Sequence, residues 1–119
     1  MTAERFIWKE YADKRVLEAD YKEVDEETFL QMLDEETKII CSSTGGLLII
    51  DDVSGTRITK RIAKKAQEVA QKQQPYIKKN AIVGIKEPFK SLLNTYNVLT
   101  GVEHKLFDTK EEAITWLLE

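Results

Sequence analysis

The stretch LLIIDDVSGTRIT, residues Leu47 to Thr59, places four aliphatic residues directly before two aspartates, a Ser-Gly turn and a polar entry into a helix. A short aliphatic run that ends in a turn is typical of a buried strand. Polar residues just past the carboxyl end of such a strand lie where open α/β sheets usually keep their binding sites. The stretch therefore predicts a buried strand followed by a candidate site, and it does not by itself name a ligand.

The length of 119 residues predicts one domain, residues 1–119. A chain of this size buries about two-thirds of the surface that it exposes when unfolded, so it needs no disulfide or metal. Cys41 is the one cysteine, and a small buried hydrophobe is a better interpretation of it than a reactive thiol. The opening MTAERFIWKE carries four charges and is not typical of a signal peptide. We therefore expect a cytoplasmic protein whose contact with a membrane, if any, is peripheral.

The net charge of −3 conceals an uneven distribution of charge along the chain. Residues 1–36 hold twelve acids and five bases, whereas Arg57 to Lys79 hold eight bases and Glu68 as the one acid. Two such segments on different faces would create an electrostatic dipole. The basic segment is either a solvated helix face, the more common case, or a surface for an anionic partner or membrane. Nucleic acid is not expected, because the chain is acidic overall and Tyr76 is the one aromatic of the basic segment.

Alternating apolar and polar residues in the first twenty positions predict an antiparallel hairpin, with Tyr11 to Lys14 as its turn. Asp25 is a suitable N-cap for the helix that follows, and two glutamates favour its first turn through the helix dipole. Gly45 and Gly46 are expected to end this helix. Its expected apolar stripe consists of Phe29, Leu30, Leu33, Thr37, Ile40 and Cys41.

The second half of the chain predicts strands alternating with helices. The expected elements are a helix from about Thr59 to Gln73, a strand at Ala81 to Ile85, a helix from Pro88 to Gly101, a strand at His104 to Phe107 and a last helix with Thr109 and Glu112 as its capping box. The order ββαβαβαβα favours a mixed five-stranded α/β sheet, antiparallel in its first hairpin and parallel in the remainder, with four main helices.

Four phrases of the sequence, DDVSGT, PYIKKNAIVGI, YNVLTG and LFDTKEEAITWL, together resemble the SpoIIAA-like proteins, bacterial relatives of STAS domains. The resemblance covers nearly the whole chain. It implies the STAS-like α/β fold, which is similar to that of the CRAL-TRIO domains that carry lipids. In STAS proteins that act as anti-sigma-factor antagonists, a partner kinase phosphorylates a serine at the start of the helix after the third strand.

The place that corresponds to this serine holds Arg57 and Ile58, followed by Thr59. We therefore predict that phosphorylation of this turn does not switch the protein. A phosphate on Thr59 would be favourable at a helix N-terminus, but Thr59 or Thr56 is better interpreted as the helix cap.

No residue pattern in the sequence indicates catalysis, a metal site or a cofactor. Asp51 and Asp52 are adjacent on a strand and point to opposite faces, and Asp52 is expected to accept hydrogen bonds from the turn that follows. His104 is the one histidine, which excludes a histidine cluster or a two-histidine dyad. The chain has neither GxGxxG nor GxxxxGK[ST].

Two classes of function remain. The first is a non-enzymatic STAS-like module that meets a protein partner or an anionic membrane through the turn and the basic helix; its candidate residues are Asp52, Ser54, Thr56, Arg57, Thr59, Lys60, Arg61 and Lys64. The second is a carrier or sensor of an apolar, lipid-like molecule, with the helix from Pro88 to Thr100 as a lid over a pocket lined by Phe89, Leu93 and Tyr96. A packed core beneath that helix favours the module and an apolar cavity favours the carrier.

A homodimer is also expected. The aliphatic strands need cover on both faces of the sheet, and a fold with most helices on one face leaves the other for the hairpin or for a second copy of the chain.

Overall fold

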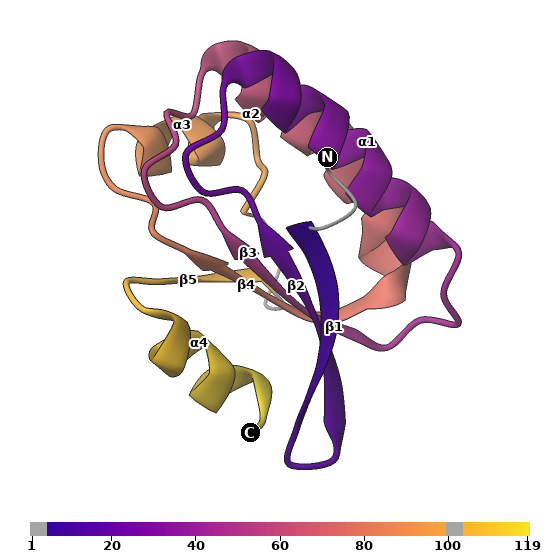
Figure 1. Ribbon diagram of the computed structural model, residues 1–119. Helices are drawn as coiled ribbons and strands as arrows, with labels where there is room; N and C mark the ends of the chain where they lie inside the picture. Colours follow the sequence, from indigo (N-terminus) through magenta and orange to yellow (C-terminus); the bar gives the residue numbers. More distant parts are fainter. Residues whose placement is uncertain (1–4, 100–103) are drawn as a thin grey trace.

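The computed structural model describes residues 5–99 and 104–119. Its elements follow the predicted order of strands and helices (Figure 1). They are β1 (Phe6–Tyr11), β2 (Lys14–Asp20), α1 (Glu26–Cys41), β3 (Leu47–Asp52), α2 (Lys60–Gln73), the short 3-10 helix η2 (Gln74–Tyr76), β4 (Ile77–Val83), α3 (Phe89–Thr95), β5 (His104–Phe107) and α4 (Lys110–Leu117).

The strands form one sheet in the order β1-β2-β3-β4-β5. The β1 and β2 strands are antiparallel, and each of the other neighbouring pairs is parallel, which confirms the predicted mixed sheet. Ala12 and Asp13 connect the hairpin with positive φ angles of 49° and 70°, the backbone that a tight two-residue turn requires.

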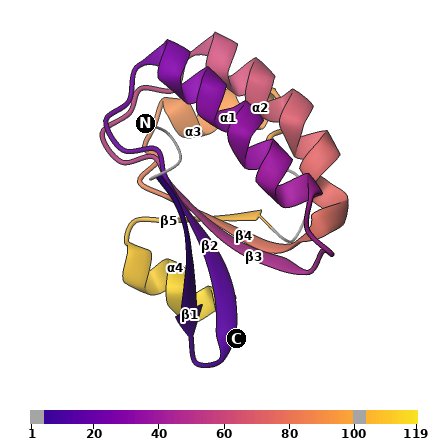
Figure 2. The same ribbon diagram turned by 45° about the vertical axis from the view of Figure 1, so that its right-hand side comes forward.

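Helices cover the two faces of the sheet unequally. The α1, α2 and α3 helices lie on one face, and α4 lies on the other (Figures 1 and 2). The alternation of side chains along β3 follows this arrangement, since Ile49 packs with Ile40 of α1 while Ile50 packs with Leu117 of α4. An aliphatic run such as LLII therefore arises because both of its faces are buried.

Two predicted helices end earlier than expected. Helix α1 ends at Cys41, where the Ser42 and Ser43 hydroxyls bond to carbonyls of its last turn, so the glycine pair follows the helix and does not end it. Helix α3 ends at Thr95, not at Gly101. Asn97 has a φ of 57°, and the Val98 amide donates to the Leu93 carbonyl at 3.0 Å. This is the six-to-one bond of a Schellman motif, which terminates a helix. The predicted residues 100 and 101 of that helix lie outside the described residues.

The buried stripe of α1 also differs from the predicted one. It consists of Phe29, Met32, Leu33, Glu36 and Ile40. Leu30, Thr37 and Cys41 are only partly buried. A glutamate therefore occupies the middle of the helix face that packs on the sheet.

The face opposite α1 is covered in part by α4, which packs against β3, β4 and β5. On β1, at the edge of the sheet, Ile7 is 47% exposed. The homodimer stays a prediction. None of the described helices has the length and apolar character needed to cross a membrane.

Candidate functional site

The turn after β3 is held together by its own side chains. Oδ1 of Asp52 accepts hydrogen bonds from the amide and the hydroxyl of Ser54, at 3.0 and 2.7 Å. Thr56 Oγ1 donates to the carbonyl of Tyr21 at 2.7 Å and accepts from the amide of Val24 at 3.1 Å. The expected role of Asp52 is confirmed, and Thr56 ties this turn to the segment after β2.

Thr59 is the N-cap of α2, as the sequence predicted. Its hydroxyl accepts from the Ile62 amide at 3.2 Å and donates to Oε1 of Glu26 at 2.6 Å. That bond is the main cause of a lowered pKa of the Glu26 carboxyl. Ile58, the residue directly before Thr59, is buried.

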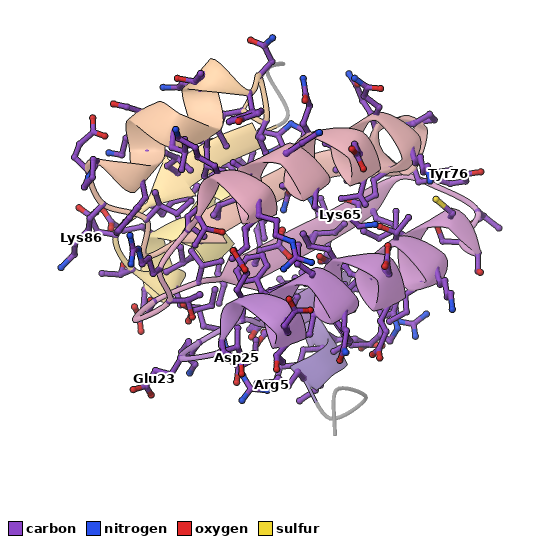
Figure 3. All side chains as sticks on the ribbon, turned by 90° about the horizontal axis from the view of Figure 1, so that it is seen from above. Arg5, Glu23, Asp25, Lys65, Tyr76 and Lys86 are labelled. Atoms are coloured by element: carbon purple, nitrogen blue, oxygen red, sulfur yellow. The ribbon has the colours of Figure 1, made fainter. Side chains whose placement is uncertain are left out.

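Acidic α1 and basic α2 lie side by side (Figure 3). Arg61 bonds to Glu26 at 3.2 Å and also to Glu27, and Lys65 bonds to Asp34 at 2.9 Å. Acidic α1 and basic α2 therefore share one surface and pair across it, so in this part of the chain the acidic and basic segments do not lie on the different faces that a dipole would require. Lys60 and Lys64 are exposed on the same helix.

A surface groove of about 520 Å³ lies at the carboxyl ends of β3 and β4. The turn after β3 forms one wall, and the segment from Gly84 to Phe89 forms another. Its lining includes exposed Arg57 and Lys86 and a partly buried Phe89. Lys86 lies at the opposite end of the molecule from Tyr76 (Figure 3). We call this feature the turn groove; its lining residues are Val53, Ser54, Gly55, Thr56, Arg57, Ile58, Gly84, Ile85, Lys86, Phe89 and Asp108.

Gly84 allows the close approach of the two walls. Its φ is +91°, and a Cβ atom there would lie 2.2 Å from Oγ of Ser54 and 2.8 Å from its Cα. Only glycine fits both the backbone angle and the space. Of the predicted site residues, Ser54, Thr56 and Arg57 line the turn groove, whereas the basic residues of α2 lie outside it.

The three residues of the predicted apolar pocket do not line one common space among the cavity and groove described for residues 5–99 and 104–119. Leu93 lines a cavity of about 70 Å³ between the sheet and the helices α1 to α3. Phe89 lines the turn groove instead, and Tyr96 lines neither space. Val53, Ile58 and Ile85 line both spaces, so the cavity lies directly beneath the turn groove.

This cavity contains a pair of carboxyl groups that the sequence analysis missed. Glu36 of α1, 2% exposed, and Asp51 of β3 both line it. The Tyr21 hydroxyl donates to Oε1 of Glu36 at 2.7 Å. The Asn80 amide donates to Oδ2 of Asp51 at 3.0 Å and to the Ile49 carbonyl at 3.3 Å. The remaining oxygens, Oε2 of Glu36 and Oδ1 of Asp51, accept from no N–H or O–H donor of the described side chains or backbone.

Burial raises the pKa of Glu36 well above its ordinary value, and the neighbouring charge of Asp51 acts in the same direction. The hydrogen bond from Tyr21 opposes this shift. Burial likewise raises the pKa of the Tyr21 hydroxyl, with a further contribution from Glu36. The carboxyl of Glu36 therefore keeps its proton to a higher pH than the carboxyl of an exposed glutamate.

The sequence held two signals for this pair. Asp51 lies two residues after Ile49 and four after Leu47 on the same strand, so its side chain lies on the same buried face as theirs. Glu36 lies three residues after Leu33 and four before Ile40, on their helix face. Within residues 5–99 and 104–119, no group of three or more His, Cys, Asp or Glu side chains is placed to hold a metal ion.

The mixed sheet in sequential order, with three helices on one face and one on the other, is an α/β architecture of the SpoIIAA-like class. A solved structure similar to it is that of an uncharacterized protein from the DUF3478 family, with a SpoIIAA-like fold, from Shewanella loihica PV-4. The two share 21% sequence identity and a TM-score of 0.63 over 94% of this chain and 91% of that one. This likeness shows the fold. No protein-family model matches the sequence, and no curated protein matches it either.

Proposed function

We propose that this protein is a non-enzymatic binding module of the STAS-like kind, and that it meets a protein partner through the turn groove. The observation that carries the proposal is the position of the groove at the carboxyl ends of β3 and β4. Open α/β sheets bind their ligands at such ends, where loops from several strands converge. A SpoIIAA-like fold is consistent with a regulatory role of this kind.

The chemistry of the groove indicates the partner. Arg57 and Lys86 supply exposed positive charge to the groove, against one exposed acid, Asp108, and the apolar ring of Phe89 is part of the same lining. A partner segment with an acidic residue beside an apolar side chain complements both features, since charge steers the encounter and the buried apolar contact supplies most of the affinity. On α2, the acids of α1 neutralise Arg61 and Lys65, so Lys60 and Lys64 are the more available cations.

The interior of the protein does not support the second candidate function, that of a carrier for a lipid-like molecule. The cavity of about 70 Å³ is smaller than the roughly 150 Å³ that accommodates benzene in an engineered protein core. It also has carboxyl groups in its wall. An acyl chain would therefore have to displace packed residues such as Leu93 and bury apolar carbon against polar groups.

The proposal is tested by affinity capture from extracts of the source cells with three forms of the protein. The parent is compared with the double variant Arg57→Glu and Lys86→Glu, and with a matched control, Lys72→Glu and Lys78→Glu, which reverses two exposed charges outside the groove. A protein retained by the parent and the control but lost from the groove variant supports the proposal. Equal capture by all three forms contradicts it.

Flotation with vesicles containing anionic phospholipid distinguishes a membrane from a protein partner. We expect no vesicle binding by the parent at physiological salt. Vesicle binding that the groove variant loses, together with no specific protein capture, would replace the protein partner with an anionic membrane surface.

A further inference from the structure

The cavity beneath the turn groove combines three properties that are seldom found together in a small core. It has room, about 70 Å³, against the roughly 30 Å³ that one water molecule occupies in the liquid. Its wall carries two carboxyl groups, from Glu36 and Asp51, and each has one oxygen without an N–H or O–H donor. The rest of the wall is largely apolar, with Val53, Ile62 and Leu93 among its members.

Two of the titratable groups that line this cavity are carboxyl groups. Its titratable lining residues are Tyr21 after β2, Glu36 on α1, Asp51 on β3 and His104 on β5, while the lining residues of α2 and α3 are uncharged. No lysine or arginine lines it among the described residues. An ionised pair would therefore lie in an apolar enclosure without a lysine or arginine counter-charge, which is costly unless a cation or a proton supplies it.

We propose that this cavity binds the ammonium group of a small primary amine, held between the carboxyl groups of Glu36 and Asp51. An ammonium group has three N–H donors, and the two carboxyl oxygens left without donors can accept two of them. The short alkyl part of the amine contacts the aliphatic wall. This site lies beneath the turn groove and shares lining residues with it, but its test does not depend on the partner proposed for that groove.

Proton balance follows from the proton that buried Glu36 retains. When an alkylammonium ion enters with its own charge, this proton leaves to solvent, and the ammonium group takes its place between the two carboxyl groups. Binding at neutral pH therefore releases one proton for each amine bound, and the affinity falls as the pH decreases, by up to about tenfold per pH unit.

Because the cavity is small, the amine used as a probe must be small as well. Ethylammonium has three heavy atoms, and the best ligands of this size reach a dissociation constant on the order of 1 mM. Two-dimensional amide NMR of the labelled full chain suits such weak binding. Ethylammonium chloride is compared at equal ionic strength with sodium chloride, with ethanol, which has similar shape and no charge, and with tetramethylammonium chloride, which has charge and no N–H donor.

We expect saturable shifts for ethylammonium at the backbone amides of Glu36 and Asp51 and at the side-chain amide of Asn80, and none for the three controls. Base uptake in an unbuffered titration should equal one proton per ethylammonium bound. Glu36→Gln, which keeps the size of the side chain, should weaken binding at least tenfold, whereas Glu68→Gln, an exposed change on α2, should leave it unchanged.

Three results would overturn the proposal. They are the absence of any saturable shift with ethylammonium, equal shifts with ethanol or tetramethylammonium, and binding without proton release. The proton count is measured on the unaltered protein, so it decides the matter even if Glu36→Gln fails to fold. The two proposals can be tested separately. A groove variant that loses partner capture but still binds the amine would show that the two sites act independently.

Discussion

The hydroxyl of Tyr21 donates a 2.7 Å hydrogen bond to Oε1 of Glu36, and both side chains are almost completely buried. Tyr21 follows β2, and Glu36 lies in the middle of α1, so this bond ties the sheet to its main covering helix. The ring of Tyr21 also contacts that of Phe29, with centroids 4.6 Å apart. One side chain therefore combines apolar packing with satisfaction of a buried carboxyl group.

Replacing Tyr21 with phenylalanine should reduce the free energy of unfolding by about 1 to 3 kcal/mol, because Glu36 loses a donor that water cannot easily replace. Urea denaturation measures this change. Tyr96→Phe, which removes a hydroxyl outside the carboxyl cluster, is the control and should have little effect. A Tyr21→Phe protein as stable as the parent would show that the bond contributes nothing net.

Replacing Glu36 with glutamine should change how stability depends on pH. An unfolded glutamate, with a pKa near 4.5, loses its proton as the pH rises above that value. In the folded protein, Glu36 keeps its proton to a higher pH. The folded state therefore binds more protons than the unfolded state, and this group makes the parent less stable as the pH rises above about 4.5. Glutamine does not titrate, so Glu36→Gln should gain on the parent as the pH rises.

The gain should be at most about 1.4 kcal/mol per pH unit, and it should be absent near pH 4. Urea unfolding of both proteins at several pH values between 4 and 8 measures it. Taking the difference removes the contributions of the titrating groups that do not interact with Glu36. A difference that does not change with pH would mean that Glu36 titrates normally in the folded protein.

Local signals in the sequence were sufficient for most of the fold. The alternation in the hairpin and the caps at Asp25, Thr59 and Thr109 depend on neighbouring residues alone, and the structure confirms them. The early end of α3 also has a local cause, because Asn97, directly after the last turn, has a left-handed backbone. This end was missed because the apolar pattern continues through Leu99 and favoured a longer helix.

The candidate site was harder to predict because it depends on which elements become neighbours. Arg61 belongs to a basic segment in the sequence, and only the packing of α2 beside α1 brings Glu26 and Glu27 to it. Glu36 was missed for a different reason. A glutamate in an amphipathic helix normally faces water, and its burial is tolerated here because Tyr21 and Asp51 lie opposite it.

Phosphorylation of the turn should not occur at stoichiometric levels. The hydroxyls of Ser54, Thr56 and Thr59 each donate to an acceptor within the fold, at 2.6 to 2.7 Å. A phosphate on Thr59 would also lie beside the carboxylate of Glu26, where repulsion opposes the favourable effect of the helix N-terminus. Incubation with cell extract and ATP, followed by mass spectrometry of these three residues, tests the expectation. Complete modification of any one of them would contradict it.

Replacing Thr59 with alanine should reduce the free energy of unfolding by about 1 kcal/mol, because the Ile62 amide at the start of α2 loses its acceptor. Thr59→Ser keeps the hydroxyl and should remain within a few tenths of a kcal/mol of the parent. Thermal denaturation of the three proteins gives the comparison. Equal loss in both variants would indicate that the methyl group of Thr59, and not its capping oxygen, stabilises the helix.

Replacing Gly84 with alanine should be more damaging than the same change at Gly46. Both residues have positive φ, +91° and +68°, so each substitution costs about 1 to 2 kcal/mol of backbone strain. A Cβ at Gly46 meets nothing within 4 Å, whereas at Gly84 it would lie 2.8 Å from the Cα and 2.9 Å from the N of Ser54, backbone atoms that cannot rotate away. We expect Gly84→Ala to lose about 3 kcal/mol or more of the free energy of unfolding. Chemical denaturation of both variants measures the difference, and equal losses would show that the two walls of the turn groove can separate at little cost.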